Sequence, residues 1–262
     1  MAEMFANALA YERFMGRWSA RLAPLFADFA GVRDDTRILD VGCGTGSLVH
    51  EIAARTRRAT IVGIDPSEGF LAHARARFSD PRITFDCGSG LDLPYADATF
   101  DQTLSSLVII FVPQPESMAR EMRRVTRPGG TVAACAWDRE GLQMAALLWE
   151  EAGKIAPDAV SESGRPRHSD RQGAVATLWR NVGLCDVEEA ALVIRTDFDS
   201  FADYWDPMAA GVGPPGMLVA ALSPEQRAAL EKALRARVLG GAADGPFSLP
   251  AQAWAVRGTV PA

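Results

Sequence analysis

Short apolar segments alternate with amphipathic segments along the first half of this chain. Strand-like runs occupy residues 37–42, 60–65, 82–87, 99–106 and 131–138, and helix-like patterns occupy 47–56, 69–78 and 115–126. Two later strand-like runs, at 187–198 and 251–260, bring the expected number of strands to seven. Because strands that alternate with helices pair in parallel and carry helices on both faces, the pattern predicts an α/β fold with a doubly wound, mostly parallel sheet.

Two segments interrupt this alternation after Asp138. Residues 139–185 and 199–248 have mainly helical patterns, and we expect them to pack together as a lid. The glycine- and proline-rich residues 211–216 predict a flexible joint, whereas Ser223, Pro224 and Gln226 predict the start of a helix. The sequence therefore divides into leader helices (1–30), a core (31–138), a helical lid insertion (139–185), a core strand (186–198), a second lid insertion (199–248) and a closing core strand (249–262).

Composition narrows the classes of partner. The chain has 262 residues, of which 48% are hydrophobic and 23% charged, as expected for a globular protein. Its net charge of −6 and pI of about 5.2 argue against a nucleic-acid partner, which needs a basic surface. No apolar run is long enough to span a membrane, and no signal-peptide pattern opens the chain, so we expect a cytoplasmic protein. The four cysteines and three histidines show no metal-ligand spacing, and no metal site is predicted.

The sequence ILDVGCGTGSLV, at residues 38–49, predicts a strand that leads into a ligand-binding turn. A P-loop would require a Gly-Lys-Ser/Thr ending, which is missing here. A dinucleotide fingerprint would require glycine where Ser47 stands. Asp40 would repel a pyrophosphate, but it suits a ligand that carries an ammonium group and a sulfonium.

This glycine turn resembles motif I of the class I S-adenosylmethionine-dependent methyltransferases. Two further landmarks of this family are Asp65 in GIDPS and the Ser105–Ser106–Leu107 segment. The stretches LPYADATFD at 93–101 and RPGG at 127–130 resemble the family's bacterial small-molecule branch. The resemblance covers about residues 9–138 and, more loosely, the final strands. It implies a Rossmann-like methyltransferase fold and S-adenosyl-L-methionine as the cofactor.

The resemblance also implies roles for particular residues. Asp65 would bind both ribose hydroxyls, and Arg17 in the leader YERFMGRWS would pair with the cofactor's carboxylate. An equally good interpretation of the leader is a helix packed on the sheet, with Arg17 merely solvated. Ser89 stands where family members commonly have an aspartate for the adenine amino group, although Gly90 still offers its backbone N–H. The predicted cofactor-binding set is Tyr11, Arg17, Asp40, Gly42, Gly44, Gly46, Asp65, Pro66, Ser89, Gly90, Leu91 and Ser105.

The expected function is methyl transfer to an O, N, S or C nucleophile of a small molecule. The signature motifs of adenine-N6 and cytosine methylation are missing, in keeping with the acidic pI. An NAD-dependent oxidoreductase and a non-catalytic S-adenosylmethionine-binding module remain the alternatives. Trp137 and Asp138 are expected to face the substrate. His168 is either a base delivered by the lid or, as is more common for a lone loop histidine, a solvated residue. No catalytic residue and no oligomeric state is predicted.

Overall fold

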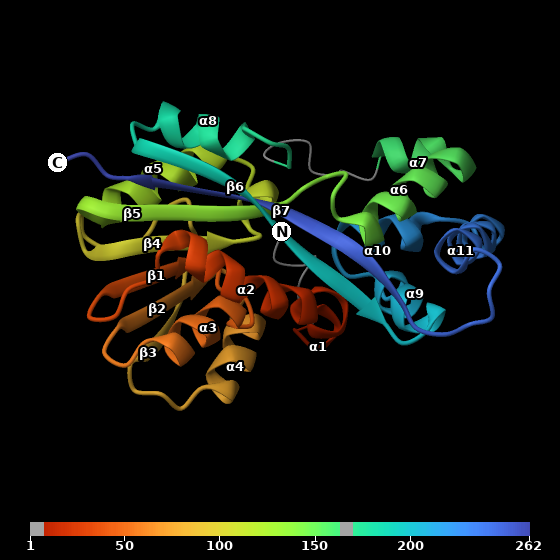
Figure 1. Cartoon of the computed structure of the whole chain (residues 1–262), viewed down its shortest axis with the longest axis horizontal. Helices are drawn as coiled ribbons and strands as arrows, with labels where there is room; N and C mark the ends of the chain where they lie inside the picture. The colour runs from red at the N-terminus through yellow and green to blue at the C-terminus, as the bar shows by residue number, and fades with distance from the viewer. Residues whose placement is uncertain (1–7, 163–169) are drawn as a thin grey trace.

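A seven-stranded sheet runs through the centre of the computed structural model, which describes residues 8–162 and 170–262 (Figure 1). The strand order is β3-β2-β1-β4-β5-β7-β6, and β7 runs antiparallel to both of its neighbours. The strands are β1 (Arg37–Val41), β2 (Thr60–Asp65), β3 (Ile83–Cys87), β4 (Phe100–Ser106), β5 (Thr126–Trp137), β6 (Cys185–Phe198) and β7 (Phe247–Thr259). The predicted doubly wound, mostly parallel sheet is confirmed. Its order reverses between β1 and β4, where α/β proteins of this kind bind ligands.

Helices cover both faces of the sheet. Helices α2 (Arg17–Ala30), α3 (Ser47–Arg55) and α4 (Glu68–Arg77) lie over one face, and α5 (Pro115–Val125) and α8 (Ala174–Asn181) lie over the other (Figure 1). Neighbouring residues of β1 serve opposite faces, as the pleat of a strand requires. Ile38 belongs to the same hydrophobic cluster as Trp18 of α2, whereas Leu39 belongs to that of Met122 and Trp179.

Five further helices gather beyond the carboxyl end of β5, beside the end of β6 and the start of β7 (Figure 1). They are α6 (Gln143–Ile155), α7 (Pro157–Glu162), α9 (Phe201–Ala209), α10 (Gly213–Ala221) and α11 (Pro224–Leu239). The buried Tyr204 hydroxyl of α9 donates to the carbonyl of Met144 in α6 at 3.0 Å, so the two insertions share one core. We call these five helices the lid.

Two sequence interpretations change at this point. The insertion at 139–185 is divided, because α8 packs on the sheet rather than in the lid: Trp179 is fully buried there and its indole N–H donates to the Val132 carbonyl at 3.0 Å. The 211–216 stretch is also not a simple loop between helices, because α10 already begins at Gly213. Pro214 and Pro215 fit there since prolines near a helix start lose no helical hydrogen bond.

The leader contains a short π-helix. It runs from α1 (Ala8–Tyr11) through the π-helical η2 (Glu12–Gly16) into α2. Wide turns of this type are rare and frequently accompany functional sites.

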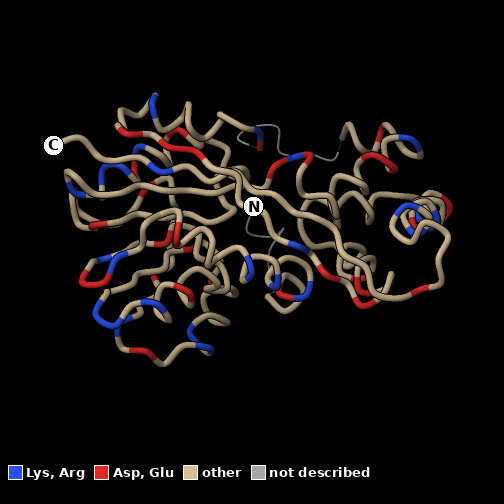
Figure 2. The backbone as a smooth tube through the Cα atoms, in the orientation of Figure 1, with Lys and Arg blue, Asp and Glu red and all other residues tan. Residues whose placement is uncertain are grey.

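Two helix starts agree with the sequence. The Ser67 hydroxyl accepts from the Phe70 N–H at the start of α4, and Ser223 and Gln226 form the predicted capping box of α11. Within the described ranges no helix has the length and apolarity needed to cross a bilayer. Basic and acidic residues are interspersed along the chain (Figure 2).

Candidate functional site

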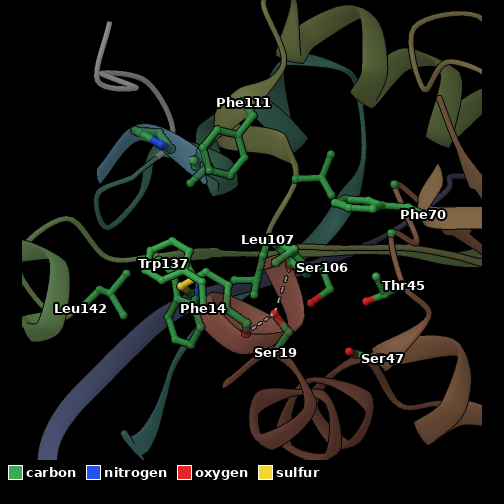
Figure 3. Close-up of a pocket in the computed structure, with 18 of the residues that line it drawn as sticks. Phe14, Ser19, Thr45, Ser47, Phe70, Ser106, Leu107, Phe111, Trp137 and Leu142 are labelled. Carbon is green, nitrogen blue, oxygen red and sulfur yellow. Dashed lines mark hydrogen bonds between the residues drawn. The ribbon is translucent and has the colours of Figure 1, made fainter. Parts of the chain in front are cut away.

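A cavity of about 240 Å³ lies at the carboxyl ends of β1, β4 and β5. Its wall combines the leader, the loops that follow β1, β2, β4 and β5, and residues of the lid helices α6 and α10. Figure 3 shows Thr45 and Ser47 at one end of this cavity, and Phe14, Trp137 and Leu142 gathered at the other. The cavity therefore has a glycine-turn end and a lid end that differ chemically.

The glycine turn after β1 owes its shape to three left-handed backbone conformations. Gly42, Gly44 and Gly46 have φ values of +76°, +54° and +89°, which L side chains rarely adopt. A Cβ on Gly42 would stand 2.5 Å from Val108, and one on Gly46 would stand 2.7 Å from Phe78. A Cβ on Gly44 would meet nothing closer than 3.8 Å. Gly42 and Gly46 are thus required by packing as well, while Gly44 presents bare backbone to the cavity.

Asp40 is a buried carboxylate in the cavity wall without a cationic partner among the described residues. Its side chain is 1% exposed, and Oδ1 has no hydrogen-bond partner. Burial, with a smaller contribution from the negative charge of Asp65, raises the pKa of Asp40 to about 8. Such a group is costly unless a ligand supplies the missing positive charge, so this end of the cavity suits a cation.

Asp65, at the end of β2, holds the glycine turn and still has capacity for a ligand. Its Oδ2 accepts from the Gly44 N–H at 3.0 Å, and its Oδ1 accepts from the Ser67 N–H at 2.8 Å. Burial raises the pKa of Asp65, and these two backbone hydrogen bonds oppose the increase. A carboxylate has about four acceptor positions, so two remain for hydroxyl groups. The next residue, Pro66, also lines the cavity.

The leader forms part of the cavity wall and contacts Phe70 of α4. The rings of Tyr11 and Phe70 lie 5.2 Å apart, and the Tyr11 hydroxyl lies 3.3 Å from the Ser19 hydroxyl. Burial raises the pKa of Tyr11, which therefore stays protonated near neutral pH. The π-helical turn brings Phe14 and Met15 to the same wall. Of these leader residues, the sequence interpretation placed only Tyr11 in the cofactor set.

Ser106, rather than the predicted Ser105, lies in the cavity wall. Ser105 is fully buried and its hydroxyl donates to the Val41 carbonyl at 2.8 Å, inside the sheet. Successive strand residues face opposite sides, so only one of the two serines can reach the ligand. Leu107 follows with a φ of +64°, an unusual conformation for leucine that reverses the chain over the glycine turn.

The predicted adenine residues Ser89, Gly90 and Leu91 do not line the cavity. They form a turn of their own, in which the Ser89 hydroxyl accepts from the Leu91 N–H at 3.1 Å. A Cβ on Gly90 would stand 2.8 Å from Val41, so this turn packs closely against β1. The described wall near Asp65 is instead completed by Ser67 and Phe70.

Arg17 also lies outside the cavity, contrary to its predicted role. Its guanidinium donates to both carboxylate oxygens of Asp203 in α9, at 2.9 and 3.0 Å, and to the Asp203 carbonyl at 3.0 Å. It also lies 4.3 Å from the centre of the Trp18 ring. These contacts link the leader to the lid and pair the guanidinium with a carboxylate of the protein. The positive charge of Arg17 is therefore not directed at a ligand.

We expect Arg17→Ala to change the affinity for S-adenosylhomocysteine by less than about fivefold, because its partly exposed ion pair contributes only about 0–1 kcal/mol. Titration calorimetry measures this affinity, with Arg21→Ala as the matched control, since Arg21 makes a comparable ion pair with Asp197. A loss of tenfold or more for Arg17→Ala alone would return the guanidinium to the cofactor site.

The lid end of the cavity is mainly apolar and aromatic. Trp137 and Asp138 line it, where the sequence interpretation expected them. Arg139 and Asp170 contribute an ion pair, with a closest N–O distance of 2.7 Å and little exposure of either side chain. The apolar contributors that sequence reasoning missed are Phe14, Met15, Phe111, Leu142, Trp149, Pro214 and Pro215. His168 lies outside the described residues.

Comparisons with known proteins agree with this geometry. Residues 38–130 match the family model described as "Methyltransferase domain". The chain is similar to an uncharacterised protein of Mycobacterium tuberculosis, with 32% identity over 124 residues that cover 47% of this chain and 44% of that protein. It is also similar to the methyltransferase GfsG of Streptomyces halstedii, with 39% identity over 101 residues, 37% of this chain and 36% of that protein. The matched stretch thus spans less than half the length of these relatives.

Solved structures extend the likeness in fold beyond this stretch. A putative methyltransferase from Bacillus halodurans superposes with a TM-score of 0.60 at 16% identity, covering 92% of this chain and 99% of that one. A phosphoethanolamine N-methyltransferase of Haemonchus contortus, solved with S-adenosylhomocysteine, gives 0.60 at 17% identity, covering 97% and 57%. Residues 38–130, at the centre of this fold, thus match a class I methyltransferase domain, for which S-adenosylmethionine is the cofactor.

Proposed function

We propose that this protein transfers the methyl group of S-adenosylmethionine to a nucleophile of a small molecule held at the lid end of the cavity. The observation that carries the proposal is the buried carboxylate of Asp40, which lacks a cationic partner among the described residues and lies in the same cavity as Asp65 and the apolar lid end. One cavity therefore offers sites for a cationic cofactor and for an acceptor. A small-molecule acceptor and a cytoplasmic location both stay predictions.

The residues of the glycine-turn end fit the cofactor. Asp40 would hold the ammonium group of its methionine part, and the two remaining acceptor positions of Asp65 would take the ribose hydroxyls. The bare backbone of Gly44 allows close approach of the cofactor to the glycine turn. None of these roles needs a phosphate-binding group.

Bound S-adenosylmethionine supplies an electrophilic methyl group on a sulfonium. The protein's contribution is to align the nucleophile with the methyl–sulfur bond and to exclude water, since the departing thioether needs no acid. The aromatic and apolar walls at the lid end are suited to both tasks. A base for the nucleophile's proton is required only where the acceptor does not lose that proton readily.

We expect S-adenosylhomocysteine to bind and NAD not to bind measurably. Asp40 and Asp65 are acidic groups that offer a pyrophosphate no positive charge, whereas S-adenosylhomocysteine carries an ammonium group, with which Asp40 can pair, and no phosphate. Calorimetric titration with S-adenosylhomocysteine, NAD and NADH checks this, and adenosine serves as the control for the nucleoside part alone. Binding of NAD as tight as that of S-adenosylhomocysteine would favour the oxidoreductase alternative.

Methyl transfer itself is tested by incubating the protein with S-adenosylmethionine and a compound panel, and by measuring S-adenosylhomocysteine release. Release that depends on one class of acceptor would support an enzyme. Tight binding without release for any class would favour the non-catalytic binding module.

A further inference from the structure

The charged side chains of the cavity wall are predominantly acidic. Among the described residues, four carboxylates and one guanidinium line it: Asp40, Asp65, Asp138, Asp170 and Arg139. The one guanidinium is already paired with Asp170, so the described wall offers no unpaired cation to an anionic occupant.

Asp138 is the carboxylate that the proposed function leaves unassigned. Asp40 and Asp65 belong to the cofactor end, and Asp170 is neutralised by its ion pair with Arg139. Asp138 has no ion-pair partner among the described residues. One of its oxygens, Oδ2, accepts from the Gly141 N–H at 2.8 Å and so fixes the turn that follows β5.

The position of Asp138 fits contact with the acceptor. It is half-buried and directly follows Trp137, the last residue of β5, so the sheet fixes its backbone. The Asp138 N–H donates to the Gln252 carbonyl at 2.9 Å, and the Asp138 carbonyl accepts from Leu142 N–H at 3.0 Å. The backbone is thereby held on both sides, while the carboxylate lines the cavity.

Aromatic side chains accompany this carboxylate. Trp137 and Phe14 lie at the same end of the cavity (Figure 3), and Phe111 and Trp149 also line its wall. The faces of aromatic rings attract cations, and rings and methylene groups together provide an apolar surface. A carboxylate amid aromatic rings is a combination that favours an organic ammonium group.

We propose that the methyl acceptor is an amine on an apolar, ring-containing body, and that Asp138 holds its ammonium group. This inference rests on the proposed function and names its substrate class. The ammonium group loses one proton to the Asp138 carboxylate or to solvent, which frees the nitrogen lone pair. That lone pair forms the new N–C bond to the methyl group, the S–C bond breaks, and its electron pair stays on sulfur as S-adenosylhomocysteine forms.

Matched probes that share one ring body test the inference. The protein, saturated with S-adenosylhomocysteine, is titrated with tryptamine, tryptophol and indole-3-acetate, and with 2-phenylethylamine, 2-phenylethanol and phenylacetate. At least one amine should bind about tenfold or more tightly than its alcohol, with the matching acid weakest, because one charged hydrogen bond in a desolvated site has about this effect. With S-adenosylmethionine, the same amine should gain one methyl group, which mass spectrometry detects.

Variants separate the role of the Asp138 charge from that of the turn. Asp138→Asn keeps an oxygen for the Gly141 N–H and should remove the preference for amine over alcohol, with S-adenosylhomocysteine affinity unchanged. Asp138→Glu should keep part of the preference. Asp97→Asn, which neutralises a mostly exposed carboxylate outside the cavity, is the control and should behave as the unmodified protein.

Three results would overturn the inference: neither amine binding more tightly than its matching alcohol and acid, no binding of either amine, or an amine preference that survives Asp138→Asn. Each would be seen in a protein that still binds S-adenosylhomocysteine. If the unmodified protein did not bind S-adenosylhomocysteine, the proposed function would be overturned instead, so the two failures are distinguishable.

Discussion

Replacing Asp40 by asparagine should weaken S-adenosylhomocysteine binding by about tenfold to a hundredfold, because a charged hydrogen bond contributes about 1.5–3 kcal/mol. The substitution removes the charge and leaves the shape of the side chain nearly unchanged. Since Asp40 is 1% exposed and lacks a cationic partner in the described part of the chain, nothing else there would balance the ligand's ammonium group. Titration calorimetry at neutral pH measures the difference.

The same substitution should make the ligand-free protein more stable. The pKa of Asp40 is about 8 in the folded protein and about 3.9 in an unfolded chain, so between these pH values only the folded state holds the proton. The free energy of unfolding therefore falls as pH rises through this window. Asparagine does not titrate, and the gain in Tm of Asp40→Asn should grow from about pH 5 to about pH 8.

The number of protons released on ligand binding provides a control for the role of Asp40. Below about pH 8 the ligand must displace the Asp40 proton, so binding should release protons, as calorimetry in buffers of different ionisation enthalpy detects. Asp40→Asn should abolish that release, whereas Asp28→Asn, a neutralised surface carboxylate, should not. Unchanged affinity in Asp40→Asn would assign the ammonium group to another partner.

Replacing Asp65 by alanine should weaken S-adenosylhomocysteine binding by about a hundredfold, or roughly 3 kcal/mol. Two losses combine in this variant. The ribose hydroxyls lose their acceptor, and the Gly44 and Ser67 N–H groups lose the carboxylate that positions them. The fold should survive, since Asp65 ends β2 and lies outside both hydrophobic clusters.

Two further variants test this assignment. Asp65→Asn retains one acceptor oxygen and should lose less affinity than Asp65→Ala. Asp86 stands one strand away and accepts from the Tyr95 hydroxyl at 2.7 Å, outside the cavity wall. Asp86→Asn should leave the affinity unchanged. The opposite order, with Asp86→Asn the weaker binder, would move the ribose site to β3.

The sheet could be predicted from the sequence because its signal is local. Both β1 and β2 are short apolar runs bounded by turn residues, and parallel pairing follows from the helix between them. Whether α8 packs on the sheet or in the lid could not be predicted in this way. Its amphipathic pattern would fit either a lid or a sheet face, and the choice depends on the long-range contact between Trp179 and Val132.

The candidate site shows the same difference between positions that follow from local sequence and positions that depend on long-range contacts. Asp40, Gly44 and Asp65 reach the cavity because they lie near the carboxyl ends of strands or in the turn between strand and helix, where geometry follows chain order. Arg17 does not, because Asp203 lies 186 residues away and its pairing has no local signal. Ser105 and Ser106 show a finer limit: the register of β4, rather than the residue type, decides which hydroxyl faces the cavity.

The hydrophobic cluster that contains Trp18 and Ile38 continues without a break to Tyr204 and Leu230. One face of the sheet, the leader and the lid are therefore not separable modules, although only residues 38–130 match the family model. A fragment cut to those residues would expose the apolar surface that α2 covers, and it should aggregate rather than fold. Replacing the lid by that of a relative, in order to change the acceptor, would likewise require the relative's leader. The leader and the lid share one hydrophobic cluster, so substitutions in one must be matched by substitutions in the other.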